Sequence, residues 1–209
     1  MDLNKKFVIT INRQFGSGGH KIGSILAEKL NAKFLDKEIL KAITQQFNTP
    51  EEAVDKLKSN RNSWNNEFVD LYKTHVREER GVFDKLESGE MRRIFNEQAE
   101  IIRQLADKES CVIVGRCAFS VFKEHQNALK IFVHSNDDIR IKRIVNKYNI
   151  SPQDAKVMMV DNDCSRELYT KALTGTEWWD ARNYDICLDV SNFGVSGAAN
   201  YIVKLLKDE

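Results

Sequence analysis

The sequence of 209 residues has only two prolines, Pro50 and Pro152, and no glycine- and serine-rich linker. Its four cysteines contain no CxxC pair and no metal-ligand spacing, so they predict free thiols and a cytoplasmic location. No apolar run is long enough for a signal peptide or a membrane span. The formal net charge is +1 although 30% of the residues are charged, so the basic excess of a nucleic-acid-binding protein is missing. These absences favour a protein that acts on small molecules, with no membrane or nucleic-acid polymer as partner, and they allow a homo-oligomer.

The most informative segment lies near the beginning of the chain, where an apolar run at residues 7–11 precedes a turn with three glycines. A helical pattern of apolar residues follows this turn directly and includes Ile22. A strand, a glycine-rich loop and a helix in this order form a phosphate cradle, because loop N–H groups and the positive end of the helix dipole point at the anion. The residues expected to form the cradle are Phe15, Gly16, Ser17, Gly18, Gly19, His20 and Lys21.

The glycine loop departs from the P-loop signature G-x-x-x-x-G-K-[ST] at three positions. When Gly18 is aligned with the second glycine, Arg13 takes the place of the first glycine and Gly19 that of the lysine. His20 takes the place of the hydroxyl residue that normally binds Mg²⁺. Three substitutes for the missing lysine are open: Arg13, Lys21, or an arginine that a lid brings to the loop.

Four short apolar segments rich in β-branched residues predict buried parallel strands, and a fifth, weaker candidate joins them. In chain order the five candidates cover residues 7–11, 32–35, 111–114, 130–133 and 184–190. Helical patterns separate them, at residues 20–30, from about 37, at about 89–107, at 137–148 and at 195–206. The alternation predicts a three-layer α/β/α P-loop NTPase fold, with a parallel five-stranded sheet between helices. Ligands of such sheets bind beyond the carboxyl ends of the strands.

Two segments interrupt this alternation and predict helical insertions within a single domain of residues 1–209. Residues 48–88 have no strand pattern and are rich in Asn, Lys, Glu and Arg. Residues 149–183 begin with Ser151 as an expected helix N-cap and Pro152 at the first helical position. We expect the first insertion to hold an acceptor and the second, as a lid, to close over a phosphate donor.

Motifs spread over nearly the whole chain resemble the cytidylate-kinase-like branch of the P-loop nucleoside monophosphate kinases. They are FGSGG at 15–19, FLD at 34–36, VIVGR at 112–116, KIFVHS at 130–135, YDICLDVS at 184–191 and the pair of Asp163 and Arg166. The resemblance implies transfer of a phosphoryl group from ATP to a nucleoside monophosphate, with CMP or dCMP as the leading acceptor. It also implies Mg²⁺, for which Ser17 or, through water, Asp36 are the candidate ligands.

The resemblance places several residues at positions that contact the acceptor. Asp36 ends the second predicted strand, near the acceptor nucleotide, and Arg116 matches the arginine of a GRD motif. Cys117 replaces the aspartate of that motif and is expected to be an inert packing residue. Either Arg92 or Arg93 falls where a helix arginine grips the acceptor phosphate.

The resemblance also implies that Arg143 and Arg166 are lid arginines, and with Arg13 they form the set of candidate catalytic cations. Arginine suits phosphoryl transfer because its planar fork stays charged and binds phosphoryl oxygens in a bidentate manner. Asp163 resembles an acidic lid residue that recognises cytosine or orients an arginine; without the resemblance, Asp163 and Arg166 read as an ordinary ion pair. Arg140 shares a predicted helix face with Arg143 but reads as a solvated arginine.

Two alternatives remain open at the level of sequence. The replacements at Gly19 and Cys117 also fit a nucleotide-binding protein with little or no turnover. The fold additionally supports kinases of other small acceptors, because the insertions set the substrate. Trp178 and Trp179 are expected to pack the second insertion onto the sheet.

Overall fold

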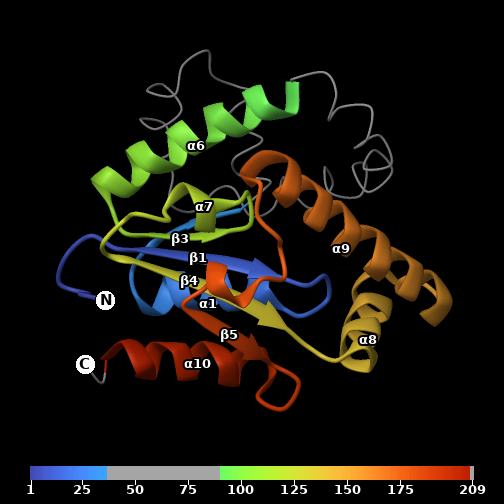
Figure 1. Ribbon diagram of the computed structural model, residues 1–209. Coiled ribbons are helices and arrows are strands. Elements are labelled where there is room, and N and C mark those ends of the chain that lie inside the picture. The colour runs from blue at the N-terminus through green and yellow to red at the C-terminus, as the bar shows by residue number, and fades with distance from the viewer. Residues whose placement is uncertain (37–89, 208–209) are drawn as a thin grey trace.

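A computed structural model describes residues 1–36 and 90–207 (Figure 1). The helix predicted from about residue 37 and the insertion predicted at residues 48–88 lie outside the described residues. The described chain forms one parallel sheet with helices on both of its faces, so the predicted three-layer α/β/α arrangement is confirmed.

The sheet contains five strands in the order β2-β3-β1-β4-β5, and every neighbouring pair is parallel. The strands are β1 (Val8–Arg13), β2 (Lys33–Leu35), β3 (Cys111–Val114), β4 (Ala128–His134) and β5 (Ile186–Asp189). All five coincide with predicted segments, although β1 continues beyond its apolar run because Asn12 and Arg13 still pair with β4. The central position of β1 places the loop that follows it between β3 and β4, at the carboxyl edge of the sheet.

The two faces of the sheet bury different helices, as the alternation of side chains along β1 requires. Ile9 and Ile11 point to α1 (Gly19–Lys29) and α10 (Gly194–Lys207), where Leu26 and Ile202 are fully buried. Val8 points to the opposite face, which α6 (Glu90–Lys108) and the short α7 (Ala118–Val121) cover. The sheet is therefore buried on both sides, which explains its continuous runs of apolar residues.

Two helices and a short 3₁₀ turn connect β4 to β5: α8 (Asp137–Tyr148), α9 (Pro152–Thr174) and η2 (Ala181–Asn183). The Ser151 side chain accepts the Asp154 N–H at 3.1 Å, so the predicted N-cap and the proline at the start of α9 are confirmed. Figure 1 shows α8 and α9 beside the end of β1 at which the arrow points. The helical segment predicted between β4 and β5 thus lies next to the glycine loop.

Trp178 attaches the end of this connection to the sheet. Its side chain is almost fully buried and packs against Phe132 and Tyr184, with a ring-centroid distance of 5.4 Å to Phe132. The Tyr184 hydroxyl donates to the Trp178 carbonyl at 2.8 Å. The predicted packing role of Trp178 is confirmed, whereas Trp179 keeps 45% of its surface exposed.

Candidate functional site

The glycine loop between β1 and α1 has a backbone that only glycine adopts without strain at two positions. Gly16 has a φ of +78° and Gly18 a φ of +94°. A Cβ atom on Gly18 would lie 2.6 Å from Cγ2 of Val195, and one on Gly16 would lie 2.9 Å from the Arg140 carbonyl oxygen. Gly18 is the N-cap of α1 and has no side chain to cap it, so N–H groups of the first turn are left for water or a ligand.

A buried ion pair between α8 and α9 holds the beginning of this loop. Arg140 is 3% exposed; its Nε donates to the Phe15 carbonyl at 2.7 Å, and its Nη2 pairs with Asp163. The Phe15 N–H in turn donates to Oδ1 of Asp163 at 2.7 Å. Both polar groups of Phe15 therefore bind the Arg140–Asp163 pair. Its N–H points to Asp163, although the sequence predicts Phe15 as part of the phosphate cradle.

This arrangement corrects the interpretation of Arg140 and refines that of Asp163. Arg140 is not a solvated helix arginine, because it is buried and contacts Asp137, Asp163 and the Phe15 carbonyl. Asp163 also accepts a hydrogen bond from Arg166 at 3.0 Å. Asp163 was expected either to recognise cytosine or to orient an arginine, and the structure shows it bound to two arginines, Arg140 and Arg166.

Two of the three arginines predicted as catalytic lie against the loop from the side of α8 and α9. Nη1 of Arg143 donates to the Ser17 carbonyl at 2.7 Å, and burial lowers the pKa of this guanidinium from its ordinary value. The Arg166 guanidinium lies 5.3 Å from the centroid of the Phe15 ring, a cation–π distance. The fold thus places Arg143 and Arg166 against a loop that lies more than 100 residues away from them in the sequence.

Arg13, the third candidate, lies on the other side of the loop. Its Cβ and Cγ atoms are 2.6 and 2.9 Å from where a Cβ atom on Gly19 would be. Its guanidinium reaches the carboxyl end of β3, where Nη1 occupies the space that a side chain on Gly115 would need. Lys21, another candidate substitute for the lysine, is exposed on α1.

The structure pairs His20 with Asp36, a contact that sequence reasoning missed. Nε2 of His20 lies 2.7 Å from Oδ2 of Asp36, and the His20 ring meets the Phe34 ring edge-on at 5.2 Å. The Asp36 side chain is only 10% exposed, while that of His20 is 57% exposed. Because Asp36 directly follows β2 and His20 lies in the first turn of α1, their proximity depends on how that strand and that helix pack.

Two residues were considered as ligands of Mg²⁺, and only one of them fits. The Ser17 hydroxyl donates to the Gln14 carbonyl at 2.9 Å, and the residue is fully buried, so its oxygen is not accessible to an ion. Asp36 places a carboxylate near the beginning of α1, and Mg²⁺ commonly binds one or two carboxylates together with substrate phosphates. Within residues 1–36 and 90–207, no three His, Cys, Asp or Glu side chains gather into a metal-binding group.

The turn after β3 carries Arg116 in an unusual backbone conformation. Gly115, Arg116 and Cys117 have consecutive positive φ angles of 83°, 55° and 50°. The Arg116 guanidinium lies 5.9 Å from the Tyr169 ring centroid, and its Nε atom is buried with no hydrogen-bond partner in the described part of the chain. Non-glycine residues in this region store strain, which structures retain mainly at functional sites. The expected acceptor residue Arg116 therefore lies at the carboxyl edge of the sheet, beside β1.

The two arginines considered at the beginning of α6 differ in what they contact. Nη2 of Arg92 donates to the Ala172 carbonyl of α9 at 2.8 Å, so this side chain links α6 to α9. Arg93 pairs with Glu97 at 2.7 Å on the exposed surface of α6. Neither has a described contact with the glycine loop.

Cys117 is a packing residue in the structure, as expected. It is buried, its Sγ lies 3.8 Å from Oγ1 of Thr170, and burial raises its pKa to about 11. Burial likewise raises the pKa of Cys111 to about 12. The thiolate is the reactive form of cysteine, so these two thiols should be inert near neutral pH.

Two of the four cysteines are buried and two are exposed, and this difference in exposure predicts the outcome of thiol labelling. At pH 8 we expect iodoacetamide to alkylate the exposed Cys164 and Cys187 in the native protein, and Cys111 and Cys117 only after denaturation. A thiol with a pKa of about 11 is ionised to only about one part in a thousand at pH 8. Peptide mass spectrometry gives the sites, and rapid native alkylation of Cys117 would contradict its burial beneath α9.

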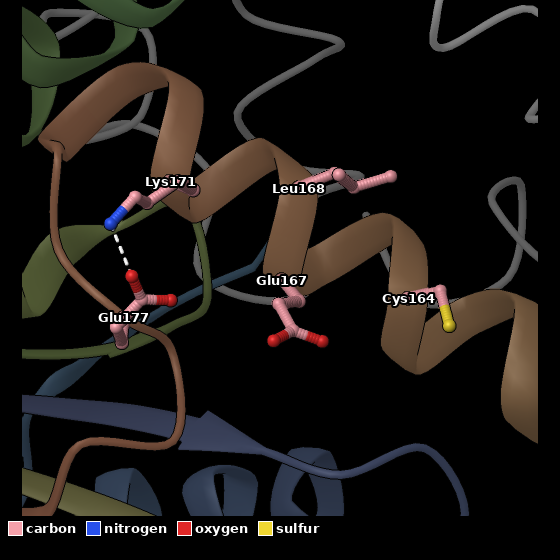
Figure 2. A pocket seen from close by; sticks show the side chains of 5 residues that line it. All are labelled: Cys164, Glu167, Leu168, Lys171 and Glu177. Carbon is pink, nitrogen blue, oxygen red and sulfur yellow. Dashed lines mark hydrogen bonds and ion pairs between the residues drawn. The ribbon is translucent and has the colours of Figure 1, made fainter.

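Two neighbouring hollows follow the exposed side of α9. The one in Figure 2 has a volume of about 340 Å³ and is lined by Cys164, Glu167, Leu168, Lys171 and Glu177, with an ion pair between Lys171 and Glu177. The other, of about 300 Å³, reaches the glycine loop through Gln14, Arg140 and Asp163 and includes Trp179. Small-molecule sites begin at about 300 Å³. The second hollow lies where a ligand could contact both α9 and the end of β1.

The parallel sheet, the glycine loop before α1 and the arginines around it define a P-loop kinase type of fold. The chain matches the sequence profile of the cytidylate kinase-like family over residues 8–192. It therefore belongs to the cytidylate kinase-like family. Comparison with curated protein sequences finds no match.

Solved structures support the same fold. An uncharacterized protein from Eubacterium ventriosum ATCC 27560 is 26% identical, with a TM-score of 0.70, and the match covers 97% of this chain and 99% of that one. A shikimate kinase from Bacteroides thetaiotaomicron is 12% identical, with a TM-score of 0.50 and coverage of 96% and 98%. The second likeness shows the fold alone. Among the described residues, no helix combines the length and the apolar character needed to span a membrane.

Proposed function

We propose that this protein is an ATP-dependent nucleoside monophosphate kinase, with CMP or dCMP as the acceptor. An oxygen of the acceptor phosphate would form a bond to the γ-phosphorus of ATP. The bond between that phosphorus and the β,γ-bridging oxygen would break, and ADP would leave with the electron pair. No redox change takes place, so the protein has only to position the reactants and to stabilise charge on the phosphoryl oxygens.

The observation that carries this proposal is the gathering of three arginines around one glycine loop. Arg143 and Arg166 direct their guanidinium groups at the loop from α8 and α9, whereas Arg13 packs its stem against Gly19 and extends its guanidinium to Gly115. These side chains contact a loop whose glycines allow the close approach of an anion. Family membership makes a nucleotide the natural anion, and Asp36 and Arg116 lie at the ends of β2 and β3, on the side where an acceptor would bind.

Mg²⁺ is part of the proposal, with Asp36 as the residue that would hold it, together with the phosphates. When bound, the ion would neutralise charge on the donor phosphates. Asp36 would then be oriented by His20, whose Nε2 lies 2.7 Å from one carboxylate oxygen. A cytoplasmic location also belongs to the proposal and rests on the four cysteines, all of which are free.

A coupled assay that detects ADP tests this function directly. ATP and Mg²⁺ are supplied with each common nucleoside monophosphate in turn, and we expect CMP or dCMP to have the highest kcat/KM. Turnover with another acceptor would correct the substrate and keep the reaction type. A complete lack of turnover with every acceptor would overturn the kinase proposal.

The loop itself can be tested with Gly18→Ala. The substitution forces a residue with Cβ into a φ of +94° and against Val195, so we expect a loss of about 2–4 kcal/mol in the free energy of unfolding. We also expect nucleotide affinity to fall at least about 10-fold, because the loop must shift. Thermal unfolding and isothermal titration calorimetry with ATP measure the two effects.

Gly194→Ala is the matched control for this substitution. Gly194 also has a positive φ, of +64°, but no atom lies within 4 Å of the position of its Cβ. The substitution should therefore lower the free energy of unfolding only by the backbone strain, about 1–2 kcal/mol, and leave nucleotide affinity unchanged. The double variant with Val195→Ala should recover part of the stability lost in Gly18→Ala. Equal losses in the two single variants would mean that the contact with Val195 does not constrain the loop.

A nucleotide-binding protein with little turnover is the second candidate. Two observations favour it: Gly19 carries no cation, and the Phe15 N–H is occupied by Asp163. The loop therefore offers fewer donors to phosphates than a complete P-loop does. Calorimetry that detects nucleotide binding, combined with the absence of turnover in the acceptor screen, would favour this candidate.

A further inference from the structure

We infer that Arg13 supplies the cation that the loop lacks at position 19, so that glycine and cation have exchanged places in this cradle. This inference rests on the proposed function, because it concerns the binding of a nucleoside polyphosphate. In the P-loop signature a glycine ends the strand and a lysine begins the helix. Here Arg13 ends β1 and Gly19 begins α1.

Steric exclusion is the first argument. A Cβ atom on Gly19 would lie 2.6 Å from the Arg13 Cβ and 2.9 Å from its Cγ. The Arg13 Cβ is attached directly to the backbone of a central strand and cannot move away. A side chain at 19 and a side chain at 13 thus exclude each other, so only one of these positions can carry a side chain, and here it is Arg13.

The backbone of Gly19 gives the second argument. Gly19 is the first residue of α1 and its φ is not positive, unlike the φ of Gly16 and Gly18. A glycine in a helix costs roughly 0.5–1 kcal/mol relative to alanine. Its conformation therefore does not require glycine, whereas its contact with Arg13 does.

A second glycine on the course of the same side chain gives the third argument. The Arg13 guanidinium lies over Gly115, where Nη1 fills the space that a side chain would occupy. Gly115 directly follows β3 and precedes Arg116. The arginine thus extends from the glycine loop towards the strand that carries the expected acceptor residue. A phosphoryl group passing from donor to acceptor has to cross this interval.

The side chain therefore combines a fixed stem with a charged end at the carboxyl edge of the sheet. Its guanidinium would donate hydrogen bonds to β- or γ-phosphate oxygens, as the lysine does in a P-loop. Arg143 has a different position, because it already donates to the Ser17 carbonyl from the side of α8. The two arginines would bind polyphosphate from opposite sides of the loop.

Arg13→Met tests the role of the charge, because methionine keeps an apolar stem beside Gly19. By calorimetry with Mg²⁺ we expect affinity for ATP to fall about 10- to 100-fold, the range for a lost charge-assisted hydrogen bond. Affinity for CMP, which has no β- or γ-phosphate, should change less than about two-fold. Lys29→Ala, which removes an exposed charge at the other end of α1, is the control and should leave both affinities unchanged.

The exchange itself is tested by Arg13→Gly combined with Gly19→Lys. This double variant recreates the order of the P-loop signature, and we expect it to bind ATP at least about 10-fold more tightly than Arg13→Gly alone. Gly19→Ala should lower the melting temperature in the wild-type chain but not in Arg13→Gly. Gly194→Ala, with open space around it, should have the same effect in both backgrounds.

The possible failures can be told apart. A wild-type protein that binds no nucleotide would refute the proposed function. If the wild type binds ATP and Arg13→Met binds it equally well, only the assignment of Arg13 is wrong. The assignment of Arg13 is also wrong if Lys21→Ala, and not Arg13→Met, lowers the affinity for ATP. A melting-temperature effect of Gly19→Ala that is equal in both backgrounds would overturn the steric argument.

Discussion

Replacing Arg143 with alanine is expected to lower kcat by about 10³-fold or more, the lower end of the range for a cation that stabilises a transferring phosphoryl group. The structure gives this arginine a defined place: Nη1 donates to the Ser17 carbonyl at 2.7 Å, next to Gly18. Partial burial removes the guanidinium from some of its water and lowers its pKa, and in these less polar surroundings its charge acts more strongly than it would in water. Steady-state kinetics with ATP, Mg²⁺ and the best acceptor measure the effect.

Two further variants make this result specific. Lys142→Ala removes an exposed positive charge from the neighbouring position of α8 and should change kcat by less than about two-fold. Arg143→Lys keeps the charge but loses the planar fork, so we expect a kcat between those of the wild type and Arg143→Ala. An Arg143→Ala enzyme that is folded and retains full kcat would show that this arginine only stabilises the loop.

The second large effect is expected for Asp163→Ala, which should lower the free energy of unfolding by about 3–5 kcal/mol. Asp163 neutralises the buried Arg140 and accepts the Phe15 N–H at 2.7 Å. Its removal leaves the charge of Arg140, which is 3% exposed, with only the exposed Asp137 as its acidic partner, and it leaves the Phe15 N–H without an acceptor. Denaturant unfolding measures the change, and the melting temperature should fall by roughly 6–20 °C in a chain of this size.

Glu97→Ala is the control for an exposed ion pair. Glu97 pairs with Arg93 on α6 at 2.7 Å, but both side chains are exposed, so its loss should cost less than about 1 kcal/mol. In the background of Arg140→Met the cost of Asp163→Ala should decrease, because the buried charge is no longer there. Similar losses of unfolding free energy for Asp163→Ala and Glu97→Ala would mean that the buried ion pair of Arg140 and Asp163 does not stabilise the protein more than an exposed one.

The sequence predicted the elements of the fold well because each depends on a local pattern. The apolar runs of β1 and β3 and the cap formed by Ser151 and Pro152 are visible within a few residues. The glycine loop was predicted for the same reason, since neighbouring residues suffice to recognise a strand, a turn and a helix. The structure then showed which of these glycines have a positive φ, namely Gly16 and Gly18.

The contacts around the loop were harder to predict because they join distant segments. Arg140 read as a solvated residue, since its partners Phe15 and Asp163 are 125 and 23 positions away. The signal that could have identified it is its spacing of three residues from Arg143 on one helix face. The pairing of His20 with Asp36 likewise depends on the packing of α1 beside β2.

The strand, the glycine loop and the helix could be predicted from neighbouring residues alone, as could the absence of a lysine at position 19. The contacts of the arginines around the loop became apparent only in the folded chain, because the sheet order puts β1 between β3 and β4 and the packing of α8 against α9 buries Arg140 with Asp163. The fold also shows that a side chain at Gly19 would collide with that of Arg13, a contact that cannot be read from the sequence. Local backbone preferences are encoded in adjacent residues, whereas a charge acquires its partners only when the chain is packed.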